Sequence, residues 1–144
     1  MEHPLLNQKG PVPSAVDLEE AVLGAIMLDN EALKSVTEIL GEKMFYKPEH
    51  QAIYNAILSL QKSKTAVDIL TVTQELVKKG NLEKAGKAYY VTQLTNRIGS
   101  SANVEAHARI VQEMYLKRQA IALGYSLLQK GYDDGENCFE VLDY

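Results

Sequence analysis

Residues 103–130 read NVEAHARIVQEMYLKRQAIALGYSLLQK. This stretch has no proline, and its one interruption is Gly124, which a helix tolerates at a modest cost. Apolar side chains recur every three or four positions, the spacing that places them along one side of a helix: Val104, Ala108, Val111, Met114, Tyr115, Ile121, Tyr125 and Leu128. The stretch therefore predicts one long amphipathic helix.

The length of this helix has a consequence for the fold. At 1.5 Å per residue it spans about 42 Å, whereas a compact chain of this size has a radius of gyration of only about 14–15 Å. We expect the helix to project beyond the residues that precede it. Its apolar stripe then needs a further helix, from this chain or from a partner.

The residues after the long helix predict a helical hairpin. Residues 132–137 (YDDGEN) form a turn in which Asn137 is a candidate helix cap. Residues 138–142 begin another amphipathic helix shortly before the sequence stops. We expect the missing part to be the returning arm of a hairpin.

The residues before the long helix predict a compact helical head. All four prolines lie within the first 48 residues, and the periodicity predicts helices over 15–28, 31–40, 49–62, about 69–79 and 87–97. Ser14 (with Asp17), Asn30 and Asp68 are the expected N-caps, and Pro48 fits a first helical turn. The β-branched stretch 65–73 also permits a strand, but no partner strand is visible.

The predicted architecture is thus all-α: a compact helical head followed by a long projecting helix that starts a helical hairpin. We expect a flexible N-terminal tail over 1–14 and a globular head over 15–100. Residues 101–144 are the first arm and turn of the hairpin, with its return arm truncated.

Composition limits the function classes. The chain has 144 residues and a formal net charge of −4, so charge alone does not predict binding to nucleic acid. The single cysteine, Cys138, forms neither an internal disulfide nor a zinc site. Neither a signal peptide nor a membrane-spanning stretch is visible. We expect a cytoplasmic protein without membrane attachment.

No motif predicts an active site. Residues 80–88 (GNLEKAGKA) resemble a phosphate-binding loop. However, five residues separate the two glycines where the motif has four, and Ala88 stands where the motif has the Ser or Thr whose hydroxyl binds magnesium. The histidines at positions 3, 50 and 107 lack metal-ligand spacing. The helix dipole accounts for Glu19–Glu20 at a helix start, and His50 is interpreted as a packing or hydrogen-bonding residue. We therefore expect no catalytic residue, cofactor or metal in this chain.

Two other features have ordinary structural interpretations. The lysine groups 62/64, 78/79 and 84/87 form at most a weak patch for nucleic acid, and solvated helix ends explain them better. At least one residue of the pair Tyr89–Tyr90 is expected in the core.

Three ordered blocks resemble the N-terminal domain of bacterial replicative DNA helicases of the DnaB type. They are 20–29 (EAVLGAIMLD), a middle set comprising 45–46, 50–54 and 67–72 (FY, HQAIY, VDILTV), and 102–113 (ANVEAHARIVQE) followed by 116–118 (LKR). The match extends over about residues 11–142. One departure is Ala85–Gly86, where the family usually has two glycines.

The resemblance implies a non-catalytic function. In the family, hairpins of two subunits pack together, the dimers assemble into a trimer-of-dimers collar on a hexameric ring, and the collar docks the C-terminal domain of primase. The ATP-hydrolysing, DNA-translocating RecA-like domain that follows this region is absent from the sequence. ATP, magnesium and DNA contact belong to that missing domain, and the parent protein is expected to be an ATP-dependent DNA helicase.

Two sets of residues follow from these arguments. The self-association set combines the apolar stripe with a polar residue that fixes its register: Val104, Val111, Tyr115, Arg118, Ile121, Tyr125 and Leu128. The primase-docking set is placed by the resemblance near the junction of head and hairpin: Asp17, Tyr89, Ile121 and Leu127.

Two other function classes remain possible from the residues alone. A stand-alone helical adaptor or DNA-binding regulator needs a recognition helix with clustered Arg or Lys side chains, and none is found. An enzyme needs a catalytic constellation, which is also lacking.

Overall fold

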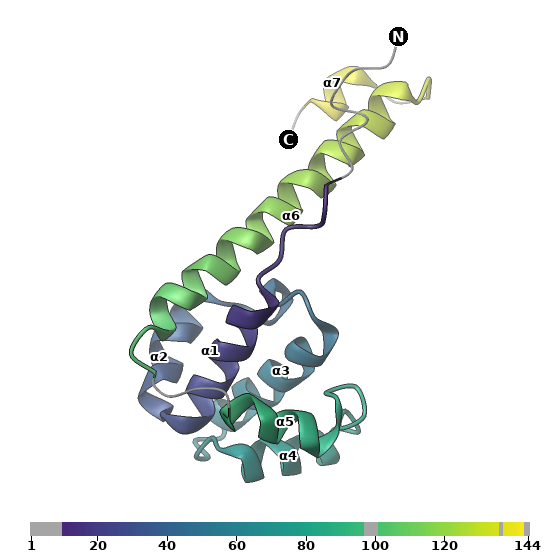
Figure 1. The fold of residues 1–144 in the computed structure, drawn as a ribbon. Helices are drawn as coiled ribbons and strands as arrows, with labels where there is room; N and C mark the ends of the chain where they lie inside the picture. Colours follow the sequence, from purple (N-terminus) through teal and green to yellow (C-terminus); the bar gives the residue numbers. More distant parts are fainter. Residues whose placement is uncertain (1–9, 97–100, 136, 143–144) are drawn as a thin grey trace. The chain divides into compact units, whose positions relative to one another are not determined.

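A computed structural model describes residues 10–96, 101–135 and 137–142. Over these residues the chain forms α-helices, one 3-10 helix and no strand (Figure 1), which confirms the all-α prediction. The elements are α1 (Val16–Leu28), α2 (Asn30–Ile39), η2 (Glu42–Met44), α3 (Pro48–Lys62), α4 (Ile69–Lys78), α5 (Lys87–Asn96), α6 (Val104–Tyr132) and α7 (Cys138–Val141).

The chain divides into two compact units. The first, here called the head, is Ser14–Tyr115, and the second, here called the arm, combines residues 1–13 with Leu116–Tyr144. The head therefore extends beyond the predicted limit at residue 100. It does so because Val104, Ala108 and Val111 at the start of α6 are buried in the head core.

The core of the head forms around α1 and α3. Helix α1 packs against α2, α3 and α5, and α4 packs against α3 and α5 (Figure 1). Leu23, Ile26, Ile53 and Ile57 are completely buried, and burial of each such side chain contributes about 1.5–3 kcal/mol. Tyr54 is equally buried and donates its hydroxyl hydrogen to the carbonyl oxygen of Leu40 at 2.8 Å.

Several predicted helix boundaries are confirmed. Pro48 lies in the first turn of α3, where its missing N–H has no helical partner to lose. Asp68 caps α4 through a complete capping box with Thr71, so the stretch 65–73 leads into a helix and not a strand. Asn137 accepts a hydrogen bond from the backbone N–H of Phe139 at the start of α7.

Two predicted caps are wrong. Helix α1 is preceded by Ala15, without a side-chain cap, so Ser14 and Asp17 form no capping box. The cap of α2 is Asp29, which accepts from the backbone N–H of Glu31. Asn30 has a different role, because its side-chain amide donates to the carbonyl oxygen of Val67 and accepts from its N–H. This pair of bonds fixes the start of α2 to the loop before α4.

Some sequence predictions lie outside the described residues. Most of the N-terminal tail (residues 1–9) is among them, as are residues 97–100 before Ser101. Among the helices that the structure describes, none combines the length and apolarity needed to cross a membrane.

Candidate functional site

The C-terminal half of α6 carries an unusual number of exposed apolar side chains. Leu116 is 57% exposed and Tyr125 is 56% exposed, although both belong to a regular helix. The other exposed members of this surface are Ile121, Leu123, Leu128 and Tyr132. At 100° per residue, one side of the helix carries Ile121, Tyr125, Leu128 and Tyr132, and the opposite side carries Leu116 and Leu123. Exposed apolar side chains gathered on a helix mark a site of association. We call residues 116–132 the apolar arm surface.

A shallow groove lies at the distal end of this surface. Gly124, Leu127, Leu128, Gly131 and Tyr132 enclose about 490 Å³. Every lining residue is apolar or, in the case of Tyr132, aromatic, so the groove is suited to hydrocarbon side chains and offers no chemistry for catalysis.

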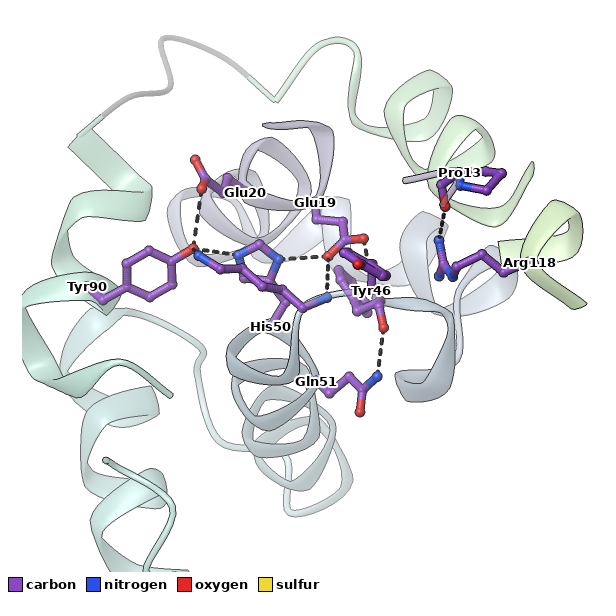
Figure 2. A network of polar contacts seen from close by, with 10 residues as sticks. Pro13, Glu19, Glu20, Tyr46, His50, Gln51, Tyr90 and Arg118 are labelled. Atoms are coloured by element: carbon purple, nitrogen blue, oxygen red, sulfur yellow. Dashed lines mark hydrogen bonds and ion pairs between the residues drawn. The ribbon is translucent and has the colours of Figure 1, made fainter. Parts of the chain in front are cut away.

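The N-terminal segment contacts the same arm. The guanidinium of Arg118 donates to the carbonyl oxygen of Pro13 at 2.8 Å (Figure 2). This bond holds the extended residues before α1 against α6. Arg118, expected to fix the register of self-association, therefore also has a partner within its own chain.

The structure divides the predicted self-association set. Val104 and Val111 are core residues of the head, 8% and 1% exposed. The prediction that they contact another subunit is therefore wrong. They are buried because the head covers the first turns of α6. Tyr115 and Arg118 are half-buried, whereas Ile121, Tyr125 and Leu128 are exposed on the arm.

The primase-docking set is distributed over both units. Asp17 and Tyr89 are exposed on the head, on α1 and α5 respectively. Ile121 is exposed and Leu127 is half-buried on the arm. Their joint role remains a prediction.

A buried polar network lies inside the head, and sequence reasoning missed it. Figure 2 shows Glu19 of α1, His50 of α3 and Tyr90 of α5 in one line. The Nδ1 atom of His50 lies 2.7 Å from Oε1 of Glu19, and its Nε2 atom lies 2.6 Å from the hydroxyl oxygen of Tyr90. Since a carboxylate only accepts, Nδ1 donates to Glu19.

The two ends of the network are also bonded. Glu19 accepts from the backbone N–H groups of Tyr46 and Lys47 at 2.8 and 3.4 Å. The Tyr90 hydroxyl lies 3.3 Å from Glu20, and the Lys47 ammonium lies 4.8 Å from the centre of the Tyr90 ring. The network thus joins α1, α5, the start of α3 and the loop before it.

The burial of this network argues for a structural role. The side chains of His50 and Glu19 are 0% and 1% exposed, so no substrate can reach the imidazole. The hydrogen-bonding interpretation of His50 is confirmed. Glu19 lies in the first turn of α1, as the helix-dipole interpretation requires. Its carboxylate is in addition a buried acceptor for two backbone N–H groups and one imidazole. The period of α1 offered a signal, since Glu19 stands four residues before the buried Leu23.

The remaining candidates show no catalytic or metal geometry. Within the part of the chain that the structure describes, no three His, Cys, Asp or Glu side chains are grouped closely enough to hold a metal ion. Gly80 and Gly86 have positive φ angles of 72° and 88°, typical of glycines that end turns. Tyr90 packs against the core, as expected for one residue of the tyrosine pair, while Tyr89 is 75% exposed.

Known proteins resemble the chain over nearly its whole length. It is 46% identical over 142 residues to a replicative DNA helicase DnaB of Rhodothermus marinus, covering 98% of this chain and 15% of that protein. It is 41% identical over 138 residues to the replicative DNA helicase DnaC of Bacillus subtilis, covering 96% and 30%. The chain thus spans less than a third of these two relatives.

Solved structures show the same fold. The N-terminal domain of DnaB helicase from Mycobacterium tuberculosis superposes with a TM-score of 0.88 at 35% identity, covering 92% of this chain and 94% of that one. A DnaB-like replicative helicase, described with its interactions with primase, superposes with a TM-score of 0.68 at 27% identity, covering 78% and 26%. The model of the DnaB-like helicase N terminal domain matches residues 12–113. The chain belongs to this family of helicase N-terminal domains.

Proposed function

We propose that the chain is a non-catalytic domain that assembles the subunits of a replicative DNA helicase and docks primase onto them. Two copies pair through their arms, and three such dimers form a collar on the hexameric parent protein. Family membership supports the link to DNA replication. The proposal places the protein in the cytoplasm, with the chromosome.

The apolar arm surface is the observation that carries this proposal. Ile121, Tyr125 and Leu128 are each more than two-fifths exposed and lie on one side of α6. Covering such a surface is favourable by about 25 cal/mol per Å² before the costs of association. A second copy of the chain supplies an equally apolar surface, so both are removed from water in one step.

Docking of primase is the finer part of the proposal. Its support is the structural relative described together with its interactions with primase. The candidate contacts are Asp17 and Tyr89 on the head and Ile121 and Leu127 on the arm. Tyr89 is the strongest of them, because exposed aromatic side chains often contribute most of the binding energy at protein interfaces.

The parent protein performs the chemistry in a separate domain. Since the chain spans only 15–30% of the curated relatives quoted above, ATP hydrolysis, magnesium binding and DNA translocation are assigned to the remaining part of such a protein. The domain described here organises the subunits and contributes no reacting group.

Assembly is tested with one charge substitution and a matched control. Ile121→Glu places a carboxylate in the apolar arm surface, and Leu70→Glu makes the same change at a residue of α4 that is 67% exposed. Size-exclusion chromatography with light scattering should give wild type and Leu70→Glu the mass of a dimer or larger oligomer at high micromolar concentration. Ile121→Glu should remain a monomer with unchanged helical circular dichroism. An identical mass for all three proteins would contradict the proposal.

Primase docking has its own measurement. Isothermal titration of the chain with the C-terminal domain of a bacterial primase should give a binding isotherm. Tyr89→Ala should weaken the binding at least tenfold, whereas Val77→Ala, which truncates another exposed side chain of the head, should not. Absence of heat with the wild-type chain would overturn the docking role and leave the assembly role untouched.

A further inference from the structure

A groove lies on the head between α2 and the loop that joins α3 to α4. It has a volume of about 380 Å³, and its lining residues belong to neither the self-association set nor the primase-docking set. Leu33 and Val67 line it and are 4% and 1% exposed, so they form its floor. Ala66, which is exposed, lines it as well. The floor is therefore suited to an apolar side chain of a ligand.

Hydrogen bonds inside the head hold the two walls of this groove together. The side-chain amide of Asn30 donates to the carbonyl oxygen of Val67 at 2.9 Å and accepts from its N–H at 2.8 Å. These bonds join the wall formed by α2 to the wall formed by the loop. A groove fixed in this way is already formed before a ligand binds, which lowers the entropy cost of binding.

The rim of the groove is basic, although the chain as a whole has a formal net charge of −4. The charged residues that line it are Lys34 and Lys64, and none of the described residues that line it is acidic. Lys34 lies 3.4 Å from Glu31, but both side chains are at least 75% exposed, so this ion pair is weak. The ammonium of Lys64 is exposed and makes no ion pair or hydrogen bond with the residues that the structure describes. The rim therefore favours a ligand that carries carboxylates.

The backbone of Lys64 indicates that its side chain is not there for the fold. Helices α3 and α4 end in the same pattern, in which the N–H groups of two residues beyond the helix bond to carbonyl groups of its last turn. The first of these two residues has a left-handed backbone, which favours glycine. Helix α4 has Gly80 at this position with a φ angle of 72°, whereas α3 has Lys64 with a φ angle of 58°. The lysine therefore lowers the stability of the head where a glycine would raise it.

We propose that this groove binds an acidic peptide segment of a partner protein. One apolar side chain of the peptide lies over Leu33 and Val67, and flanking carboxylates pair with Lys34 and Lys64. The inference adds a partner surface to the proposed function and does not depend on pairing of the arms or on docking of primase.

The lining of the groove favours a peptide over a nucleic acid. None of the described lining residues is aromatic, so no ring is available on which a base could stack. Two lysines neutralise few phosphates, and the net charge of −4 opposes a long polyanion. An apolar floor between two ammonium groups matches a leucine or a similar side chain between two carboxylates.

The charges are tested with a short labelled peptide in which one leucine is flanked by aspartates. Fluorescence anisotropy should show saturable binding to the wild-type chain at low salt, with a dissociation constant of about 100 μM or less, and added salt should weaken it. Lys64→Glu should weaken binding at least tenfold. Lys84→Glu makes the same change of charge at an exposed residue that does not line the groove, and it should change binding less than twofold.

Lys64→Gly gives opposite signs for two quantities. It should raise the midpoint of thermal unfolding by about 2–4 °C, because glycine suits the left-handed position at the end of α3. It should also weaken the peptide at least fivefold, because one of the two cations is lost. This variant keeps the test decisive if Lys64→Glu fails to fold. A stabilised variant that binds the peptide as tightly as wild type would overturn the inference.

The apolar floor is tested separately from the charges. Replacing the leucine of the peptide by serine should weaken binding at least fivefold. Ala66→Leu fills the groove and should have a similar effect, whereas Ala88→Leu, at an exposed alanine of α5 that does not line it, should have none. Equal affinities for both peptides would mean that only charge is recognised and would overturn the groove contact.

Two further outcomes decide between ligands and between proposals. Amide chemical shifts that change in residues 30–34 and 61–67 on addition of the peptide support the inference, and changes elsewhere in the head overturn it. No saturable binding of the peptide up to about 1 mM overturns it as well, as does tighter binding of a single-stranded oligonucleotide that also depends on Lys64. A chain that binds the peptide but neither dimerises nor binds primase defeats the proposed function and supports this inference.

Discussion

Glu19 is a hydrogen-bond acceptor in the buried polar network of the head. Its carboxylate accepts hydrogen bonds from His50 and from the backbone N–H groups of Tyr46 and Lys47. All of these groups come from the start of α3 or the loop before it. A single side chain on α1 therefore positions that loop against the helix.

Removal of this carboxylate should be costly. Glu19→Ala leaves a buried imidazole and two N–H groups without their acceptor, and we expect the free energy of unfolding to fall by about 3 kcal/mol. Urea titration followed by circular dichroism measures the change. Glu83→Ala, whose side chain is 83% exposed, should cost less than about 0.5 kcal/mol. Equal losses for the two variants would show that the buried network does not stabilise the head.

Because of Tyr54, the free energy of unfolding should depend on pH in the alkaline range. Burial raises the pKa of its phenol above the ordinary value near 10. The folded state therefore holds this proton more tightly than the unfolded state does. The resulting stability is fully present below about pH 10 and is lost as the pH rises through that value towards the folded-state pKa.

The Tyr54→Phe variant isolates this effect. At pH 8 it should be less stable by about 1 kcal/mol, because the carbonyl of Leu40 loses its hydrogen bond. As the pH rises to about 11, the difference from wild type should shrink or reverse in urea titrations. Tyr89→Phe, at an exposed tyrosine, should follow the wild-type curve. A constant difference between wild type and Tyr54→Phe would contradict the raised pKa.

At the scale of the elements, the turn before α5 controls how this helix meets the core. Gly86 has a φ angle of 88°, and a Cβ atom at this position would lie 3.0 Å from three carbon atoms of Tyr90. The adjacent Ala85 is completely buried and lacks a positive φ angle. The backbone at this position therefore accommodates the alanine that stands in place of the family's first glycine.

Gly86→Ala should disturb both the turn and the network. The left-handed conformation and the contact with Tyr90 should together lower the free energy of unfolding by about 1–3 kcal/mol. Gly41→Ala provides the control, because Gly41 has a φ angle of −96° and open space around it. Thermal unfolding of the two variants distinguishes them. Equal midpoints would mean that the turn adapts to a side chain.

The helices themselves follow from the sequence, but their polar contacts do not. Apolar periodicity and the signals at Pro48 and Asp68 placed α3 and α4 correctly, because these signals act within a few residues. The side chain of Asn30 suits a helix cap, but its amide bonds to the backbone of Val67 instead. The period of α1 places Glu19 on the side of Leu23, but only the packing of three helices supplies the groups from which its carboxylate accepts.

At the scale of the whole molecule, the apolar pattern of α6 serves two purposes. Val104 and Val111 are buried in the head, whereas Ile121 and Tyr125 are exposed on the arm. One continuous periodicity covers both sets, so the sequence could not show where the head ends. The structure places that limit at Tyr115. A partner is therefore needed only for the later turns of the helix.

Central to the proposed function is a surface over residues 116–132 that another copy covers. Hydrogen–deuterium exchange of the wild-type chain at a low and a high micromolar concentration tests it most directly. We predict that exchange slows at the higher concentration in peptides from 116–132, because pairing suppresses local opening of α6, while peptides from α1 and α3 are unchanged. Equal exchange at both concentrations, or slowing confined to the head, would contradict the claim.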